Sequence, residues 1–478
     1  MKQFLKNRAQ LAVGTVVLAF LILVATVPAF LTADETTDKV DKLFAAWDKT
    51  TTPGATLAVI KDGKILYERG YGMAKLEDGI VNTPDKVFDI GSVSKQFTAT
   101  CVAMLIREDK IGLDDDIRKY IPEMPAYEKP VTVNHLLHHT SGLRDYNALL
   151  SLAGFRPESD SPTVEESLEV IRRQKKLNYT PGEEYSYTNT GFFLLSQIVE
   201  RVSGKSLNAF AQERIFKPLG MTKTLFQDDH TQIIKDRATG YSRGDKGFAI
   251  SMSNWDETGD GNVYTTVRDL FLWDQAFYTN ALGKDLMDML HTQGVLNSGK
   301  KIDYAFGLVV SDYKGLKVVE HGGAWVGFRA AIIRFPEQKF SVVILANLDS
   351  IDPSGLAFKV ADIYLADLIK EPAKEETKKA AQGDAAITIP KAELEQYAGT
   401  YVSEELLDTR YVISVDKDGL VVKTRDMARA SLKVMAPDKF TLPDYGLNIE
   451  FVRGRGAKVT GFTVSVGRAA GIVFVKKS

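Results

Sequence analysis

The sequence predicts an α/β domain followed by a small all-β domain, and three observations support this prediction. Apolar strand patterns occur within residues 54–72 and again within 305–346, and the stretch between them has mainly helical patterns. Residues 371–386 combine proline, glycine and a mixed charge run, which is typical of a linker. Beyond this linker, residues 387–478 contain strand patterns throughout.

Composition excludes several classes of protein. The 478 residues are 44% hydrophobic and 26% charged, which allows a large core, and the length suggests two to four domains. The net charge of −2 argues against a general attraction to nucleic acid or to an anionic membrane. With one cysteine, Cys101, the chain has no intrachain disulfide and no cysteine-based metal site. The sequence contains no cofactor motif, so we predict chemistry by side chains alone, without cofactor or metal.

The first 33 residues have the pattern of an export signal. Lys2, Lys6 and Arg8 form a basic start, and residues 11–33 carry no charge. The small residues at 27–29 suit cleavage of a signal peptide, whereas the uncharged run is also long enough to span a bilayer as a retained anchor. Both alternatives predict an exported protein of the bacterial periplasm or cell envelope, with a membrane tether if the segment is retained.

The first strands and the first long helix follow from local patterns. Residues 54–72 predict a β-hairpin, because two apolar stretches flank an Asp-Gly pair, which is a strong signal for a tight turn. Residues 92–108 predict a helix with an apolar face. Cys101 lies about 180° around this helix from Ser92, so we predict that it is a core side chain and not a nucleophile.

Later elements of the first domain are predicted from capping signals and apolar runs. A helix at residues 190–202 ends before Gly204, and Thr266 suits the N-cap of a helix that extends to residue 277. A last amphipathic helix is predicted at 354–369. Four strands are predicted between these helices, at 305–311, 317–320, 328–335 and 340–346.

Ser92 and Lys95 form the candidate catalytic pair. A serine hydroxyl is a weak nucleophile until a base removes its proton. Residues three apart lie on the same face of a helix, so the Lys95 amine can reach the Ser92 hydroxyl. Ser94 lies on a different face. Taken alone, the Ser-x-x-Lys spacing also fits an exposed helix start.

Two later segments supply polar groups that suit acyl transfer. In the first, a Pro-Gly turn leads to Tyr187 and Asn189 just before a helix; the alternative is a tyrosine corner with an asparagine N-cap. The second begins at His321 and continues through two glycines to Ala324, between two strand patterns. Paired glycines in a strand permit the close approach of a ligand backbone, and the alternative is a β-bulge.

In this order and spacing, the three motifs resemble the serine β-lactamase and penicillin-binding superfamily. The resemblance is to its class C β-lactamase branch, which also contains DD-peptidases, D-aminopeptidases and carboxylesterases, and whose pattern is Ser-x-x-Lys, Tyr-x-Asn and Lys- or His-x-Gly. It includes residues 132–143, reaches Ala346-Asn347 and covers residues 38–370. It implies a β-lactamase/transpeptidase-like domain at 34–370, with an antiparallel sheet flanked by helices and an all-helical subdomain.

The resemblance implies a role for each residue of the first two motifs. Ser92 would be the acylated nucleophile, and Lys95 would position it and help to deprotonate it. Tyr187 would be the general base in acylation and the proton donor to the leaving group. Asn189 would hydrogen-bond Lys95 and the substrate amide.

The segment from His321 to Ala324 is implied to bind substrate. His321 would lie on the strand edge and either polarise the surroundings of Tyr187 or contact a substrate carboxylate. The backbone N–H groups of Ser92 and Ala324 would form the oxyanion hole, with Gly323 beside them. Class C β-lactamases usually carry lysine where His321 stands, whereas histidine is similar to the peptidase, aminopeptidase and esterase members. This departure lowers the expected efficiency on β-lactams.

Two polar clusters each have two interpretations. His138 and His139 are candidates for a metal site, but within the family-like segment we expect a structural role, and no His-Glu-x-x-His motif occurs. Asp256, Asp260 and Asn262 either line the site or form a turn cluster.

Residues 387–478 predict a small barrel or sandwich. Turn signals at 418–419 and 454–456 separate apolar strand patterns. The segment resembles the lipocalin-like domains appended to some D-aminopeptidase relatives. Such a domain would cap the active site or bind a feature of the substrate.

The leading hypothesis is an exported serine hydrolase that cleaves amide or ester bonds through an acyl-enzyme on Ser92. Peptidase or amidase activity on D-residue peptides is favoured over carboxylesterase activity, and both are favoured over β-lactamase activity. The alternatives are a non-catalytic penicillin-recognising binder, or a C-terminal barrel that carries a ligand beside a scaffold domain. The predicted partner is a small-molecule or peptide substrate and not nucleic acid, and no motif encodes an oligomeric state.

Overall fold

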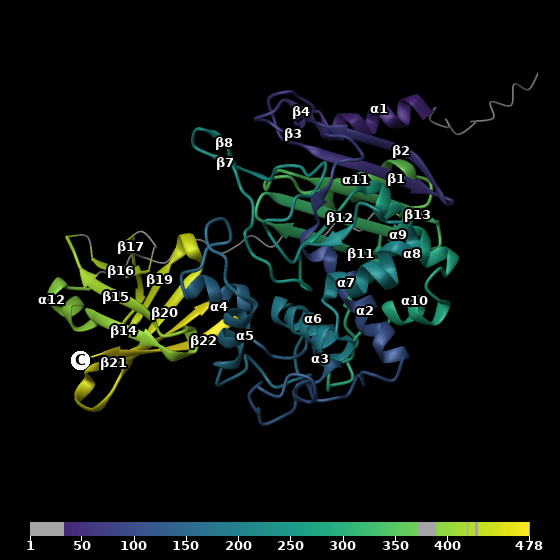
Figure 1. Cartoon of the computed structure of the whole chain (residues 1–478). Helices are drawn as coiled ribbons and strands as arrows, with labels where there is room; N and C mark the ends of the chain where they lie inside the picture. Colours follow the sequence, from purple (N-terminus) through teal and green to yellow (C-terminus); the bar gives the residue numbers. More distant parts are fainter. Residues whose placement is uncertain (1–32, 371–388, 418, 426–428, 478) are drawn as a thin grey trace, which may run out of the picture.

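The computed structural model describes residues 33–370, 389–417, 419–425 and 429–477 of the chain (Figure 1). The predicted linker, and the predicted export segment apart from Ala33, lie outside these residues. Within the described ranges, no helix has both the length and the apolar character that crossing a bilayer requires.

A six-stranded sheet contributed by both ends of the first domain forms its centre. All neighbouring strands are antiparallel, in the order β10-β11-β12-β13-β1-β2. The predicted hairpin is confirmed, because β1 and β2 pair across a turn at Asp62 and Gly63, both of which have positive φ. The strands are β1 (Ala55–Lys61), β2 (Lys64–Tyr71), β10 (Val309–Tyr313), β11 (Leu316–Trp325), β12 (Phe328–Phe335) and β13 (Phe340–Ala346).

Helices cover both faces of this sheet. Successive side chains of a strand point to opposite faces, so in β13 Val342 and Ile344 pack in one buried cluster with α1 (Ala33–Phe44) and α11 (Pro353–Tyr364). Val343 and Leu345 belong to the other cluster, together with α2 (Lys95–Arg107) and α9 (Val267–Thr279). This two-sided burial explains why β12 and β13 are continuous apolar runs in the sequence.

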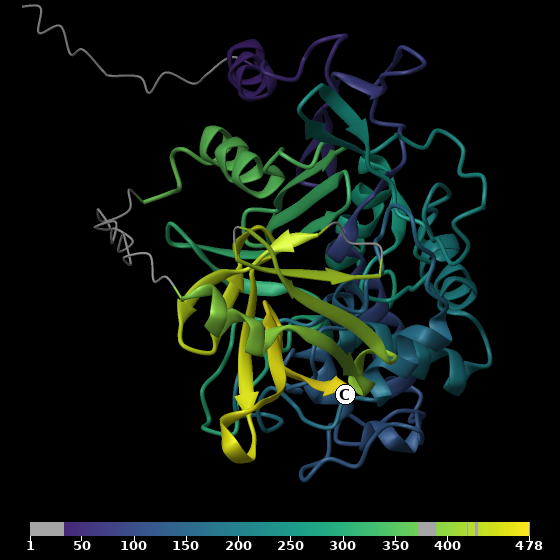
Figure 2. The same cartoon turned by 90° about the vertical axis from the view of Figure 1, so that its left-hand side faces the viewer.

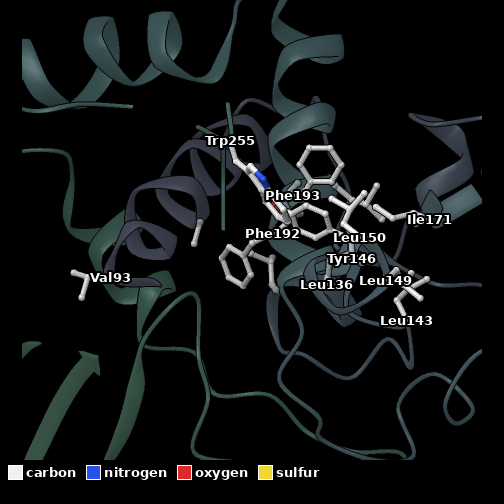
Figure 3. Close-up of a cluster of buried hydrophobic side chains, with 14 of the residues drawn as sticks. Val93, Leu136, Leu143, Tyr146, Leu149, Leu150, Ile171, Phe192, Phe193 and Trp255 are labelled. Carbon is white, nitrogen blue, oxygen red and sulfur yellow. The ribbon is translucent and has the colours of Figure 1, made fainter. Parts of the chain in front are cut away.

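A helical subdomain lies beside the sheet and contains much of the core. Figure 3 shows the aromatic side chains of Tyr146, Phe192, Phe193 and Trp255 gathered at its centre. The predicted helix before Gly204 is α6, and Gly204 ends it with a φ of +71°. The helices are α3 (Val133–Leu137), α4 (Tyr146–Leu152), α5 (Val164–Arg172), α6 (Asn189–Ser203), α7 (Leu207–Ala211), α8 (Lys217–Leu219) and α10 (Lys284–Leu290).

Short strands connect the sheet to the helical subdomain. A three-stranded sheet has the order β5-β9-β6, and two hairpins pair β3 with β4 and β7 with β8. The predicted N-cap Thr266, directly after β9, accepts a hydrogen bond from the Asp269 N–H at 3.0 Å. The strands are β3 (Met73–Lys75), β4 (Ile80–Val81), β5 (Phe88–Asp89), β6 (Leu225–Phe226), β7 (Tyr241–Gly244), β8 (Gly247–Ile250) and β9 (Val263–Thr265).

Four predicted elements differ from the observed ones, and one of them is the strand predicted at 317–320, which is β11 and extends to Trp325. The helix predicted at 92–108 begins with a 3₁₀ turn over Gly91–Ser94, and α2 starts only at Lys95. The strand predicted at 305–311 begins at Val309, because Gly307 has a φ of +70° and turns the chain. The helix predicted at 354–369 ends at Tyr364.

The C-terminal residues form a nine-stranded antiparallel sheet, as predicted (yellow in Figure 1). Its order is β17-β16-β15-β14-β22-β21-β20-β19-β18, and the two edge strands are separated in the chain only by Leu432, so the sheet nearly closes. After α12 (Lys391–Leu394), the strands are β14 (Gly399–Ser403), β15 (Thr409–Val415), β16 (Leu420–Thr424), β17 (Ala430–Ser431), β18 (Lys433–Ala436), β19 (Lys439–Leu442), β20 (Leu447–Arg453), β21 (Val459–Val466) and β22 (Ala469–Lys477).

The C-terminal sheet packs against the helical subdomain near α4 and α5 (Figures 1 and 2). Arg144 Nη1 and Glu405 Oε1 form an ion pair at 2.9 Å, and their side chains are only 3% and 6% exposed. Tyr411 of β15 donates a hydrogen bond to the Leu152 carbonyl at 3.0 Å. Both bonds are buried and join specific groups of the two parts, so they define how the C-terminal sheet meets the helical subdomain.

Candidate active site

Ser92 lies in the 3₁₀ turn between β5 and α2, and β11 packs directly against this turn. Asp89 Oδ1 accepts a hydrogen bond from the Gly91 N–H at 2.7 Å, which fixes the start of the turn. Gly91 has a φ of +49°, and a Cβ at this position would lie 2.8 Å from the Ala324 nitrogen. Glycine is therefore required where the turn meets β11.

Lys95 is buried, and its amine contacts three oxygens. Nζ lies 3.0 Å from Ser92 Oγ, 3.0 Å from Asn189 Oδ1 and 2.6 Å from the Asp260 carbonyl oxygen. Burial lowers the pKa of Lys95 to about 8, and the charges of Asp260 and Asp145 limit this effect. The amine beside the Ser92 hydroxyl can therefore gain and lose a proton near neutral pH.

Tyr187 and Asn189 enter the same site from the start of α6. The Tyr187 hydroxyl is buried and makes no hydrogen bond to a described protein atom. Burial raises the pKa of Tyr187, although the Ser92 hydroxyl and the Arg468 cation oppose the increase. The N–H of Asn189 donates to Asp145 Oδ2 at 2.7 Å. Asn189 is the first residue of the helix and Thr188 is at its N-cap, so the interpretation of Asn189 as an N-cap is wrong.

Residues 321–325 of β11 form an open edge of the sheet next to Ser92. They pair with β12 alone, because the pairing with β10 ends at Val309 and Glu320. The pairing with β12 shows no shift in register, so the β-bulge alternative is wrong. A Cβ on Gly323 would lie 2.0 Å from the Ile90 carbonyl oxygen. This contact excludes other residues at Gly323 and brings Ala324 beside the turn.

His321 is buried and neutral at pH 7. Burial, together with the charge of Lys95, lowers the pKa of His321 to about 4. Nδ1 donates to the Gly322 carbonyl oxygen at 2.6 Å, and Nε2 accepts from the Tyr304 hydroxyl at 3.0 Å. The ring centres of His321 and Tyr187 are 6.2 Å apart. His321 therefore bonds to Tyr304, and it reaches Tyr187 only by packing.

His139 and Tyr304 belong to the site, although the sequence analysis did not place them there. His139 stacks 4.1 Å from the Tyr187 ring centre and accepts a hydrogen bond from the Thr188 N–H at 3.2 Å. Tyr304 packs on His139 at 4.4 Å. His138 instead bonds to the carbonyls of Asn134 and Thr292, and no group of three metal-ligating side chains occurs in the described part of the chain.

Two openings meet at Ser92. The inner cavity, of about 40 Å³, is lined by Trp255, Trp325, Glu257 and Asp260. Its acids are buried; burial raises the pKa of Glu257 to about 7 and that of Asp260 to about 6. Glu257 Oε1 accepts from a serine hydroxyl, whereas Oε2 has no partner among the described residues. The outer cleft is lined by Tyr187, His321, Arg329, Ser354 and Arg468.

The residues of the predicted polar loop differ in whether they line the site. Asp260 and Asn262 line the inner cavity, while Asn262 Nδ2 also donates to the Trp255 and Glu257 carbonyls at 2.8 and 2.9 Å. Asp256 instead pairs with His230 at 2.9 Å. Asp260 and Asn262 therefore line the site, whereas Asp256 does not. Cys101 is buried in the core, as predicted.

Known proteins are similar to this chain in sequence. The family model for β-lactamase matches residues 40–363. A D-aminopeptidase of Brucella anthropi is 33% identical over 321 residues, which are 66% of this chain and 59% of that protein. Penicillin-binding protein 4* of Bacillus subtilis is 27% identical over 426 residues, which are 84% of this chain and 90% of that protein.

The fold agrees with a solved structure. The octameric penicillin-binding protein homologue from Pyrococcus abyssi has a TM-score of 0.63 and 24% identity, with 93% of this chain and 100% of that chain covered. The match to the D-aminopeptidase spans less than two thirds of that protein's length. The family model, however, covers well over half of the present chain. The chain belongs to the β-lactamase family of serine hydrolases.

Proposed function

We propose that the protein cleaves amide bonds of D-residue peptides or amides, or related carboxylic esters, through an acyl-enzyme on Ser92. The observation that carries the proposal is the 3.0 Å contact between the Ser92 hydroxyl and a buried amine whose pKa is lowered to about 8. A serine is activated by a neighbouring base, and an amine is such a base only if it can be neutral. A buried lysine of this kind supports catalysis over mere binding of penicillin.

The acylation step uses Lys95 as the base and Tyr187 as a proton carrier. Lys95 takes the Ser92 proton as Oγ attacks the carbonyl carbon. The oxyanion is held by the N–H groups of Ser92 and Ala324, and this stabilisation typically contributes about 3–4 kcal/mol. As the bond to the leaving group breaks, Tyr187 gives that group a proton and regains one from Lys95.

The assignment of Tyr187 as carrier and not as base follows from its pKa. Burial raises this pKa, so a tyrosinate is scarce at neutral pH, whereas neutral Lys95 is accessible. Water then hydrolyses the ester on Ser92. The attacking water molecule loses a proton to the pair formed by Tyr187 and Lys95. The same pair then returns a proton to Ser92 Oγ, which is the leaving group of this step. Asn189 positions Lys95 through the 3.0 Å hydrogen bond to Oδ1.

Two features support an amide substrate with an amino group on the acyl side. The inner cavity combines two tryptophans with Glu257 and Asp260, and Glu257 Oε2 has no protein partner among the described residues. The two carboxyl groups give this cavity an acidic lining, which would attract an ammonium group. The preference for D-residues rests on the similarity to D-aminopeptidases. β-Lactam hydrolysis is less favoured. His321 on β11 is neutral, whereas class C β-lactamases usually carry lysine at this position.

We also propose that the protein is exported. The support is the basic start and the uncharged run of residues 11–33. Fractionation of a bacterial host that expresses the full chain would test this. A protein that stays in the cytoplasm with its N-terminus intact would contradict it.

A panel of hydrolysis assays on the purified protein tests the catalytic proposal. The panel consists of nitrocefin, a p-nitrophenyl ester, and D- and L-aminoacyl p-nitroanilides. We expect the D-aminoacyl anilide to have the highest kcat/KM, with loss of turnover in Ser92→Ala and normal turnover in the control Ser151→Ala, an exposed position on α4. Fast hydrolysis of nitrocefin alone would establish a β-lactamase, and an acylation burst without turnover would establish a binder.

A further inference from the structure

The turn between β21 and β22 reaches from the C-terminal sheet into the outer cleft. β21 ends at Val466 and β22 begins at Ala469, so Gly467 and Arg468 form the tip of this hairpin. Arg468 lines the cleft together with Ser92, Tyr187 and His321. Its guanidinium carbon lies 5.4 Å from the centre of the Tyr187 ring. A residue more than 370 positions after the nucleophile is therefore part of its surroundings.

The backbone of this turn is held firmly against the helical subdomain. The Arg468 carbonyl oxygen accepts hydrogen bonds from Asn178 Nδ2 at 2.9 Å and from the Asp145 N–H at 3.3 Å. Asn178 Oδ1 in turn accepts from the Ala470 N–H at 3.2 Å. Further along β22, the Val473 N–H donates to Glu405 Oε2 at 3.1 Å. The bonds to Asn178 and Asp145 thus hold the backbone of Arg468 against the first domain, whereas the Val473 bond lies within the C-terminal domain.

The Arg468 side chain remains open to a ligand. It is 41% exposed, and its one ion pair is a 3.5 Å contact with Asp145. None of its N–H donors makes a hydrogen bond to a protein acceptor within the described ranges, although a guanidinium has five such donors. Asp145 is already occupied, since it also accepts from the N–H groups of Asn189 and Ala148.

The other cationic groups of the cleft are committed elsewhere. Arg329 Nη1 donates to the Val326 and Phe328 carbonyls, at 2.9 and 2.6 Å. Lys95 is buried among three oxygens, and His321 is neutral. The carboxylate at the cleft wall, Asp352, accepts from the Gly355 N–H at the start of α11. Among these groups, Arg468 is therefore a cation that lines the cleft beside Tyr187 and has its N–H donors open to a ligand.

We propose that Arg468 binds a carboxylate of the substrate, so that the C-terminal domain determines which substrates the first domain cleaves. The inference rests on the proposed function and deepens it. The guanidinium lies on the Tyr187 side of Ser92, where the leaving group receives its proton, and the acidic inner cavity lies at the other opening. The substrate class is a short peptide whose released part carries a free carboxylate. Planar guanidinium groups bind carboxylates through two parallel hydrogen bonds, which gives both charge and orientation.

Binding measurements in the Ser92→Ala background test this proposal without any turnover. Isothermal titration compares a D-alanyl dipeptide that has a free C-terminal carboxylate with the same dipeptide as its C-terminal amide. We expect the carboxylate form to bind about tenfold tighter, the scale of one charged hydrogen-bonded contact. Arg468→Ala should bring the ratio of the two Kd values near one, and Arg468→Lys should keep part of it.

The matched control is Arg455→Ala, in the turn at the other end of β21. This variant removes the same charge from the same domain and should leave the ratio unchanged. Equal binding of the two dipeptides in the Ser92→Ala protein, or a preference that survives Arg468→Ala, would overturn the proposal. Failure of the proposed function would give a different result. The wild type would then still bind the carboxylate dipeptide more tightly than the amide, but it would cleave no member of the hydrolysis panel.

Discussion

Replacing Tyr187 by phenylalanine should lower activity while leaving the stability of the fold nearly unchanged. The change removes one hydroxyl, which is buried and has no hydrogen-bond partner among the described residues. No hydrogen bond that the structure shows is lost, so the free energy of unfolding should change by less than about 1 kcal/mol. The same hydroxyl is the proposed proton donor to the leaving group. Its loss should lower kcat/KM by a factor on the order of 10²–10⁴.

Tyr304→Phe is the matched control, because its hydroxyl is also buried in the site but is bonded to His321 Nε2 at 3.0 Å. Removing it leaves that nitrogen unpaired, so the melting temperature should fall by a few degrees, at about 2–4 °C per kcal/mol. Calorimetry and p-nitroanilide hydrolysis would be compared in both variants. Near-normal activity in Tyr187→Phe, or a fall in its melting temperature like that of Tyr304→Phe, would refute the reasoning.

Three further variants or conditions test other parts of the site. The pKa of Lys95 is lowered to about 8. The rate of fluorophosphonate inactivation should therefore rise with pH as the ammonium group loses its proton, and it should become constant above that value. A rate that does not change from pH 6 to 10 would exclude Lys95 as the base. Gly323→Ala places a Cβ 2.0 Å from a backbone oxygen and should abolish most turnover, whereas Gly244→Ala, with its nearest neighbour at 3.9 Å, should be active. His321→Lys introduces a permanent cation and should raise kcat/KM for anionic nitrocefin relative to kcat/KM for a neutral ester. Added salt should weaken this effect. An unchanged ratio of the two kcat/KM values would count against the charge argument.

The sequence predicted the hairpin and two central strands of the sheet well, because their signals are local. β12 and β13 have the predicted bounds, since they are continuous apolar runs that end at turns. The strand predicted at 305–311 begins later than predicted, because Gly307 turns the chain and packs on the Lys95 backbone. A Cβ at Gly307 would lie only 2.6 Å from that backbone. Nothing in the local pattern distinguishes a glycine within a strand from one that ends it.

The remaining site residues come from long-range contacts that a single sequence does not encode. His139 stacks on Tyr187, and the sequence showed only a pair of adjacent histidines. Tyr304 lies far from every motif along the chain, yet bonds to His321. Arg468 is a single basic residue in a hairpin turn, a common solvent-exposed pattern. Only the contacts of this turn with Asn178 and Asp145 of the first domain bring it to the cleft beside Ser92.

Identification of the labelled serine tests the central claim most directly. The full chain is treated with a fluorophosphonate, digested and analysed by mass spectrometry, with Ser92→Ala treated in parallel. The account predicts a single phosphonyl adduct, on the peptide that contains Ser92, and no adduct in the variant. An adduct on Ser94, whose hydroxyl accepts a hydrogen bond from the Val263 N–H at 3.0 Å, or on Ser141, would contradict it, as would a wild type that takes no label.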